Sequence, residues 1–99
     1  MASQKDSWGN KEAQALLDAF SLVRNQEEMR CFLRDLLTEK EIEEFSLRYK
    51  VAKMLSQGVP YTTIVEETGM SSTTIARVQK WLTTGMGGYQ LILGREKQL

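Results

Sequence analysis

Histidine is absent from this 99-residue chain, and cysteine and proline each occur once. Without histidine, the chain cannot form a Ser–His or Cys–His nucleophile or a histidine-containing zinc site. The single cysteine, Cys31, excludes an internal disulfide, and its neighbours Phe32 and Leu33 predict a small, buried side chain. The only proline, Pro60, lies in a predicted linker, and no stretch alternates as a strand would. The sequence therefore predicts neither an enzyme nor a disulfide-stabilised domain.

An excess of charge of one sign is also lacking, because 13 lysines and arginines balance 13 acidic residues. Bulk charge therefore gives no support to nucleic-acid binding. The distribution of charge is uneven, however: residues 1–47 carry most of the acid, and after Met70 the only acidic residue is Glu96. The basic residues of this last part are Arg77, Lys80, Arg95 and Lys97.

Long hydrophobic runs are lacking as well, since no apolar run exceeds three residues. Residues 1–10 contain no hydrophobic signal core, so we expect a cytoplasmic protein that is neither secreted nor embedded in a membrane. Four carboxylates cluster where a helix is predicted to begin, which favours helix-dipole and solubility roles over metal binding. They are Glu39, Glu41, Glu43 and Glu44. We predict no metal and no cofactor.

Apolar residues recur at spacings of three and four, which predicts an all-α protein of about six helices. Residues 1–10 are predicted to be a flexible arm and residues 11–99 a single helical DNA-binding domain. Within that domain we expect dimerisation helices at 11–58, a helix-turn-helix at 61–82, and a turn with a short helix at 83–99. In this last segment the apolar side chains are expected to be packed. They are Tyr89, Leu91, Ile92 and Leu93.

The first two helices are expected at about Lys11–Arg24 and Gln26–Leu37, with Asn25 as the cap of the second. A third helix follows. Thr38 and Glu41 form a T-x-x-E capping box that opens this helix, which is expected to run to Gln57 and to end at Gly58.

The third helix carries two apolar seams, whereas a helix covered on one side shows a single stripe. One seam is Ile42, Phe45, Tyr49 and Ala52, and the other is Leu47, Val51, Met54 and Leu55. In so short a chain, a helix that is packed on both sides most easily finds its second neighbour in another subunit. The alternative is a compact monomer in which the helix has one wide apolar stripe. In the predicted homodimer the first three helices form most of the interface. Its buried residues include Phe20, Phe32, Ile42, Phe45 and Leu55.

Residues 61–82 have the pattern of a helix-turn-helix. Two short amphipathic segments flank Gly69, which can adopt the positive φ of a tight turn. Ser71 or Ser72 can cap the second helix with its hydroxyl. The shared core is expected to comprise Val65, Met70, Ile75 and Val78. The alternative is an αα-hairpin used only for packing.

The sequence of Leu36–Gly58, the glycine-turned helix pair and the STTIAR segment at Ser72–Arg77 resemble the Trp repressor superfamily and, within it, the Trp-repressor-like YerC/YecD group. The similarity covers about Leu16–Gly85. It implies an all-α, intertwined dimer in which the first three helices of each subunit interlock.

The resemblance also implies a ligand pocket. In tryptophan-binding members, two arginines and a helix-capping threonine hold the corepressor, and Arg48, Arg77 and Thr38 occupy those positions here. The glycine against which the indole packs is replaced by Val78, and its branched side chain should fill the space. We therefore expect no small-molecule corepressor.

The recognition helix is expected to present hydroxyl and basic side chains to duplex DNA. Arg77 could read a guanine through O6 and N7, or instead form an ion pair with Glu66 or Glu67, and Lys80 is placed for a phosphate. Trp81 is expected in the core or at its rim. The predicted DNA-binding residues are Ser71, Ser72, Thr73, Thr74, Arg77 and Lys80.

These features predict a bacterial-type transcriptional regulator, of the repressor kind, that binds double-stranded DNA as a homodimer with paired helix-turn-helix units. One unit reads only a few base pairs, so useful specificity requires two half-sites. Two alternatives remain open: a corepressor-dependent sensor of the Trp repressor type, and a helix-turn-helix that contacts another protein.

Overall fold

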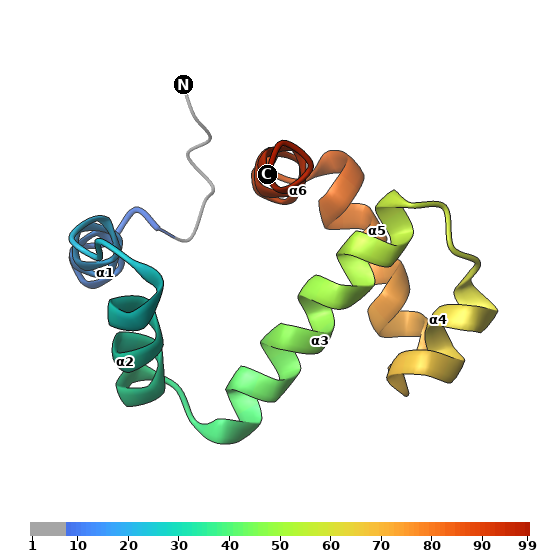
Figure 1. The fold of residues 1–99 in the computed structure, drawn as a ribbon, viewed down its shortest axis with the longest axis horizontal. Coiled ribbons are helices and arrows are strands. Elements are labelled where there is room, and N and C mark those ends of the chain that lie inside the picture. Colours follow the sequence, from blue (N-terminus) through green and yellow to red (C-terminus); the bar gives the residue numbers. More distant parts are fainter. Residues whose placement is uncertain (1–7) are drawn as a thin grey trace. The chain divides into compact units, whose positions relative to one another are not determined.

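The computed structural model describes residues 8–99, which form six helices and no strands (Figure 1). The helices are α1 Lys11–Ser21, α2 Gln26–Leu36, α3 Glu39–Ser56, α4 Tyr61–Thr68, α5 Ser72–Thr84 and α6 Gly88–Glu96. They group into two compact units, one extending to Thr38 and the other from Glu39 to Leu99. The all-α prediction is confirmed. The predicted arm falls largely outside the described residues, because residues 1–7 are not among them.

The first unit holds α1 and α2, each opened by an asparagine. The side chain of Asn10 accepts a hydrogen bond from the Ala13 N–H, and that of Asn25 accepts one from the Glu28 N–H. The rings of Phe20 and Phe32 meet edge to face, with their centroids 5.4 Å apart. Neither helix contains a buried residue. The apolar stripes of α1 and α2 therefore remain partly open to solvent.

Two expectations about this unit were wrong. The first helix ends at Ser21 rather than Arg24, because the backbone must leave the helical conformation before Asn25, which caps α2 with an extended backbone. There the Arg24 N–H donates to the Glu28 carboxylate over 2.9 Å. Cys31 is exposed, and its Sγ lies 3.9 Å from Oε2 of Glu27, one turn earlier. Apolar neighbours in sequence do not fix the direction of a helical side chain, because consecutive residues lie about 100° apart.

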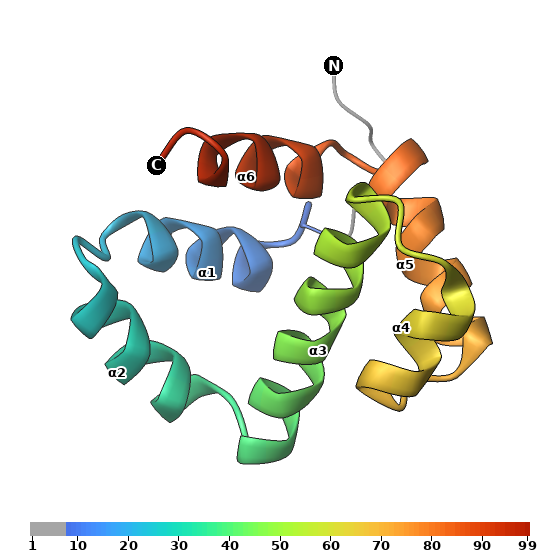
Figure 2. The same ribbon diagram turned by 45° about the vertical axis from the view of Figure 1, so that its right-hand side comes forward.

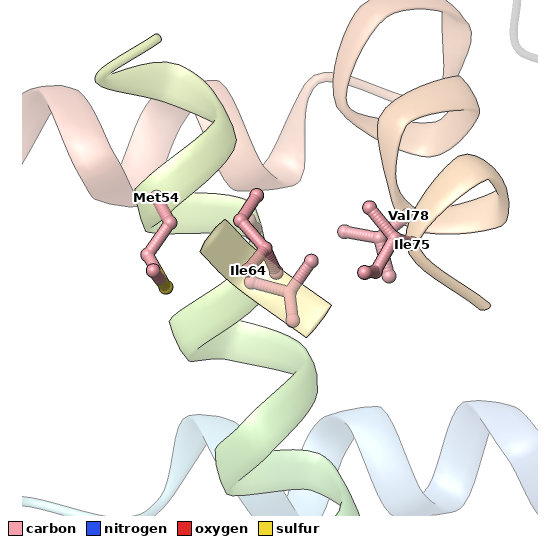
Figure 3. Close-up of a cluster of buried hydrophobic side chains, with 6 residues drawn as sticks. Met54, Ile64, Ile75 and Val78 are labelled. Carbon is pink, nitrogen blue, oxygen red and sulfur yellow. The ribbon is translucent and has the colours of Figure 1, made fainter. Parts of the chain in front are cut away.

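The second unit is built on α3. In both ribbon views α4 and α5 lie against the C-terminal half of α3, and α6 turns away from the end of α5 (Figures 1 and 2). A core of six buried side chains joins α3, α4 and α5, and Figure 3 shows it around Met54, Ile64, Ile75 and Val78. The remaining two members are Val51 and Ala52.

The core of this unit corrects the predicted choice of residue on α4. Ile64 is fully buried, whereas Val65, which was expected in the core, is 38% exposed. Ile64 points from α4 toward α3 and α5 (Figure 3). Met70 packs against this core as predicted, and Ile75 and Val78 belong to it. The rotation of α4 about its axis therefore places the neighbouring side chain, not Val65, at the centre.

The C-terminal segment is packed only in part. Leu93 is buried and Tyr89 packs against the core, but Leu91 and Ile92 are exposed. The expectation that all four would be packed was wrong for these two. A helix can direct only about half of an uninterrupted apolar run toward one neighbour.

Candidate nucleic-acid interface

The connection between α4 and α5 is a three-residue turn, Gly69–Ser71. Gly69 has a φ of 73°, in the left-handed region that favours glycine, and its N–H donates to the Val65 carbonyl over 2.9 Å. The Thr68 hydroxyl donates to the Ile64 carbonyl and accepts a hydrogen bond from the Met70 N–H. This turn satisfies its polar groups locally and sets the direction in which α5 leaves α4.

One face of α5 is committed to the core. Ile75, Val78 and Leu82 are buried and recur at spacings of three and four. The opposite side follows from the 100° rotation per residue, which places Thr73, Ala76, Arg77 and Lys80 on one outward face. All four are exposed. On this face the helix therefore presents one threonine, one alanine and two basic side chains to solvent.

The predicted DNA-binding residues at the start of α5 divide into two groups. Ser71 is the N-cap: its Oγ accepts the Thr74 N–H over 3.1 Å and donates to Thr74 Oγ1 over 3.1 Å. Ser71 and Thr74 are thus occupied with each other, and Thr74 is half-buried. Ser72 and Thr73 are exposed, and no hydrogen bond engages their hydroxyls in the described part of the chain.

The two basic residues of α5 differ in their surroundings. Within residues 8–99, Arg77 forms no ion pair with Glu66 or Glu67. Its guanidinium group is therefore available to another partner. The Nζ atom of Lys80 lies 5.7 Å from the ring centroid of Trp81, close enough for a cation–π contact. Trp81 itself is 53% exposed, which places it at the rim of the unit, one of the two predicted locations.

Comparison with known proteins agrees with this geometry. Residues 11–97 match the model of the Trp repressor protein family. The chain belongs to the Trp repressor family. It is 37% identical over 95 residues to the uncharacterized protein YerC of Bacillus subtilis (strain 168), covering 96% of this chain and 91% of that protein. As a family member, it is a helix-turn-helix protein of a DNA-binding, regulatory class.

Two solved structures share the fold. A TrpR-like protein from Eubacterium eligens ATCC 27750 has a TM-score of 0.85 and 34% identity, covering 93% of this chain and 95% of that one. A candidate Trp repressor from Staphylococcus aureus has a TM-score of 0.85 and 38% identity, covering 97% of this chain and 96% of that one. Within residues 8–99, no helix combines the length and apolar character that a membrane span requires.

The three residues at the family's corepressor positions do not all belong to the same unit of the structure. Arg48 and Arg77 both belong to the second unit, whereas Thr38 ends the first. The guanidinium carbon of Arg48 lies 5.3 Å from the ring centroid of Phe45, one turn earlier on α3. Val78 is only 2% exposed and belongs to the core of α3, α4 and α5. The valine that replaces the family's glycine is therefore a packed core residue.

Sequence reasoning missed a polar contact between α3 and α6. The Tyr49 hydroxyl donates to the Glu96 carboxylate over 3.2 Å, and Lys53 forms a 3.2 Å ion pair with the same carboxylate. Burial raises the pKa of Tyr49 above its ordinary value, and the hydrogen bond and negative charge of Glu96 add to this, while Lys53 opposes it. More than 40 residues separate the partners in sequence, so no local pattern could reveal the contact.

Proposed function

We propose that this protein is a homodimeric, sequence-specific transcriptional regulator that represses its targets by binding duplex DNA in the cytoplasm. Each subunit contributes one helix-turn-helix at residues 61–82, and residues 11–58 supply most of the dimer contacts. Its role is regulatory rather than catalytic, and it needs no small-molecule corepressor.

The outward face of α5 carries this proposal. Thr73, Ala76, Arg77 and Lys80 are exposed on the side opposite the buried residues of the helix, and Arg77 has no acidic partner in the described residues. A basic helix of this length fits the major groove, where arginine can bond guanine bidentately and lysine can neutralise phosphate. Ser72 and Thr73 are close to the N-terminus of α5 and can meet phosphate or base edges.

The first unit supports the dimer. A pair of amphipathic helices with no buried residue gains little stability by itself, because most helical stability comes from packing an apolar face. The residues predicted at the interface are half-buried in the single chain, apart from Phe45, which is 43% exposed. A second subunit would cover this surface.

Replacing Arg77 with alanine is expected to weaken operator binding by about 1–3 kcal/mol, the usual value of a bidentate base contact. Affinity for unrelated DNA should fall less. Arg77→Lys is the matched control, because lysine keeps the charge but loses the planar fork. An operator is first obtained by binding-site selection with the purified wild-type protein, and its titration by fluorescence anisotropy then measures both variants. Wild-type affinity in Arg77→Ala, with the fold intact by circular dichroism, would show that Arg77 does not contact a base of the operator.

Lys80→Ala should act differently. A phosphate contact carries no sequence information, so we expect specific and non-specific DNA to lose affinity alike. The slope of log affinity against log salt should decrease in magnitude by about one. If the loss were confined to one operator sequence and the slope were unchanged, Lys80 would contact a base instead.

Dimer formation predicts that stability depends on protein concentration, because unfolding and dissociation are coupled. The urea concentration at the midpoint should therefore rise with protein concentration. A hundredfold increase in protein concentration should stabilise the dimer against unfolding by about 2.7 kcal/mol. Urea denaturation at several concentrations, together with sedimentation equilibrium, provides the measurement. A constant midpoint with a monomer mass would refute the dimer.

A further inference from the structure

The C-terminal end of α5 is held by a side chain of the next helix. The Nε2 atom of Gln90, on α6, donates a hydrogen bond to the Leu82 carbonyl over 2.7 Å. Leu82 is one of the last four residues of α5, whose carbonyls lie beyond the reach of the N–H groups of the helix itself. The bond is partly buried, so removing the donor would leave a carbonyl short of a partner at the end of α5.

The turn between α5 and α6 brings Gln90 back to α5. The Gly85 N–H donates to the Trp81 carbonyl over 3.0 Å, and a Cβ atom at Gly85 would clash with that same oxygen. Any other residue at this position would therefore push the turn away from α5. Glycine keeps the turn close to the helix end, and the side chain of Gln90 then reaches Leu82.

Helix α6 is in turn fixed to α3. Leu93 is buried, and Tyr89 packs against the core that α3 shares with α4 and α5. One turn further along α6, the Glu96 carboxylate accepts a hydrogen bond from the Tyr49 hydroxyl and forms an ion pair with Lys53, each over 3.2 Å. Helix α6 is therefore anchored to α3 independently of its hydrogen bond to α5.

The turn of α5 that Gln90 closes also carries a basic residue of the reading face. Lys80 lies two residues before Leu82, and its carbonyl accepts a hydrogen bond from the Thr84 hydroxyl over 2.9 Å. Helix ends fray, and the terminal groups that lack partners are the first to open. Fraying of this last turn would release the backbone from which the Lys80 side chain extends.

We propose that Gln90 is a positioning residue for DNA binding, which caps the last turn of α5 and thereby holds the Lys80 ammonium group in place to meet a phosphate. This inference rests on the proposed function. It assigns α6 the role of a brace between α3 and the reading helix. Gln90 acts through the Leu82 carbonyl and makes no contact with DNA of its own.

DNA binding by Gln90→Met tests the proposal. Methionine is close to glutamine in shape but has no N–H group, so the Leu82 carbonyl loses its donor and no charge is added. Affinity for the selected operator and for an unrelated duplex should fall alike, by about threefold to tenfold, which corresponds to one lost hydrogen bond. The slope of log affinity against log salt should decrease in magnitude by up to about one, as in Lys80→Ala. Gln98→Met is the matched control, since Gln98 is exposed and lies beyond the end of α6; it should bind as wild type.

A double variant separates positioning from a general loss of stability. If Gln90 acts through Lys80, Gln90→Met should cost no further affinity in a protein that already carries Lys80→Ala. All variants are compared where circular dichroism shows complete folding and sedimentation gives the wild-type mass. Additive losses, or an unchanged affinity and salt slope in Gln90→Met, would overturn the inference and leave the proposed function standing. A wild-type protein without salt-dependent DNA binding would refute both.

Discussion

Replacing Ile64 with alanine is expected to lower the free energy of unfolding by about 2–5 kcal/mol, the range for truncating a fully buried aliphatic side chain. Ile64 has no exposed surface and is surrounded by core residues of α3 and α5 (Figure 3). Rigid helices on both sides restrict collapse of the resulting cavity, which keeps the cost high. Since a small domain is stable by only about 5–15 kcal/mol, much of that margin would be lost.

The neighbouring residue is the control for this experiment. Val65→Ala makes a similar change in the same turn of α4, but Val65 is 38% exposed. We expect its effect to stay below about 1 kcal/mol, because exposed substitutions that create no cavity are mild. Urea denaturation at one protein concentration compares the two variants. Equal losses would mean that α4 is rotated relative to this structure.

Val78→Gly is expected to cost about 2.5–4 kcal/mol. The core loses a valine that is 98% buried, worth about 1.5–3 kcal/mol, and α5 gains a glycine in its interior, which costs about 1 kcal/mol more. The expected result is a destabilised protein that binds DNA weakly at 37 °C, rather than one with a usable ligand slot. Thermal unfolding by circular dichroism, with Ala76→Gly as the glycine control on the exposed face, separates the two contributions.

The same core position bears on small-molecule sensing. Val78 is buried in the core of α3, α4 and α5, and its branched side chain should fill the space that a ligand ring needs, so we expect L-tryptophan neither to bind the wild-type protein at millimolar concentration nor to alter its DNA affinity. Isothermal titration calorimetry measures this directly. Saturable heat with micromolar affinity would make the corepressor-dependent sensor the better hypothesis.

Patterns within one helix were sufficient for most of the fold. The asparagine and serine caps and the glycine turn depend on atoms a few residues apart, so the sequence predicted Asn25 and Gly69 correctly and narrowed the cap of α5 to Ser71 or Ser72. On α4 the sequence offered two adjacent apolar residues, Ile64 and Val65. Only the angle at which α4 meets α3 decides between them, and that angle is a property of the tertiary packing.

The candidate site shows the same division. The buried side of α5 was predictable from spacing, and its exposed side followed. Ser71 and Thr74 are engaged in the cap of α5, whereas Ser72 and Thr73 are exposed. The sequence could not distinguish the two pairs, because it does not show which serine hydroxyl accepts the amide N–H of Thr74. An apolar hollow lined by Tyr49, Trp81 and Tyr89 brings together residues of α3, α5 and α6, and no single helix carries its pattern.

The division of α5 into two faces has an evolutionary consequence. The fold depends on Ile75, Val78 and Leu82, and the turn before the helix closes its hydrogen bonds with its own atoms. Thr73, Ala76 and Arg77 contribute little to either, so a mutation there can alter the preferred operator at little cost in stability. Gene duplication followed by a few changes on this face could therefore give rise to regulators with separate targets on an unchanged scaffold.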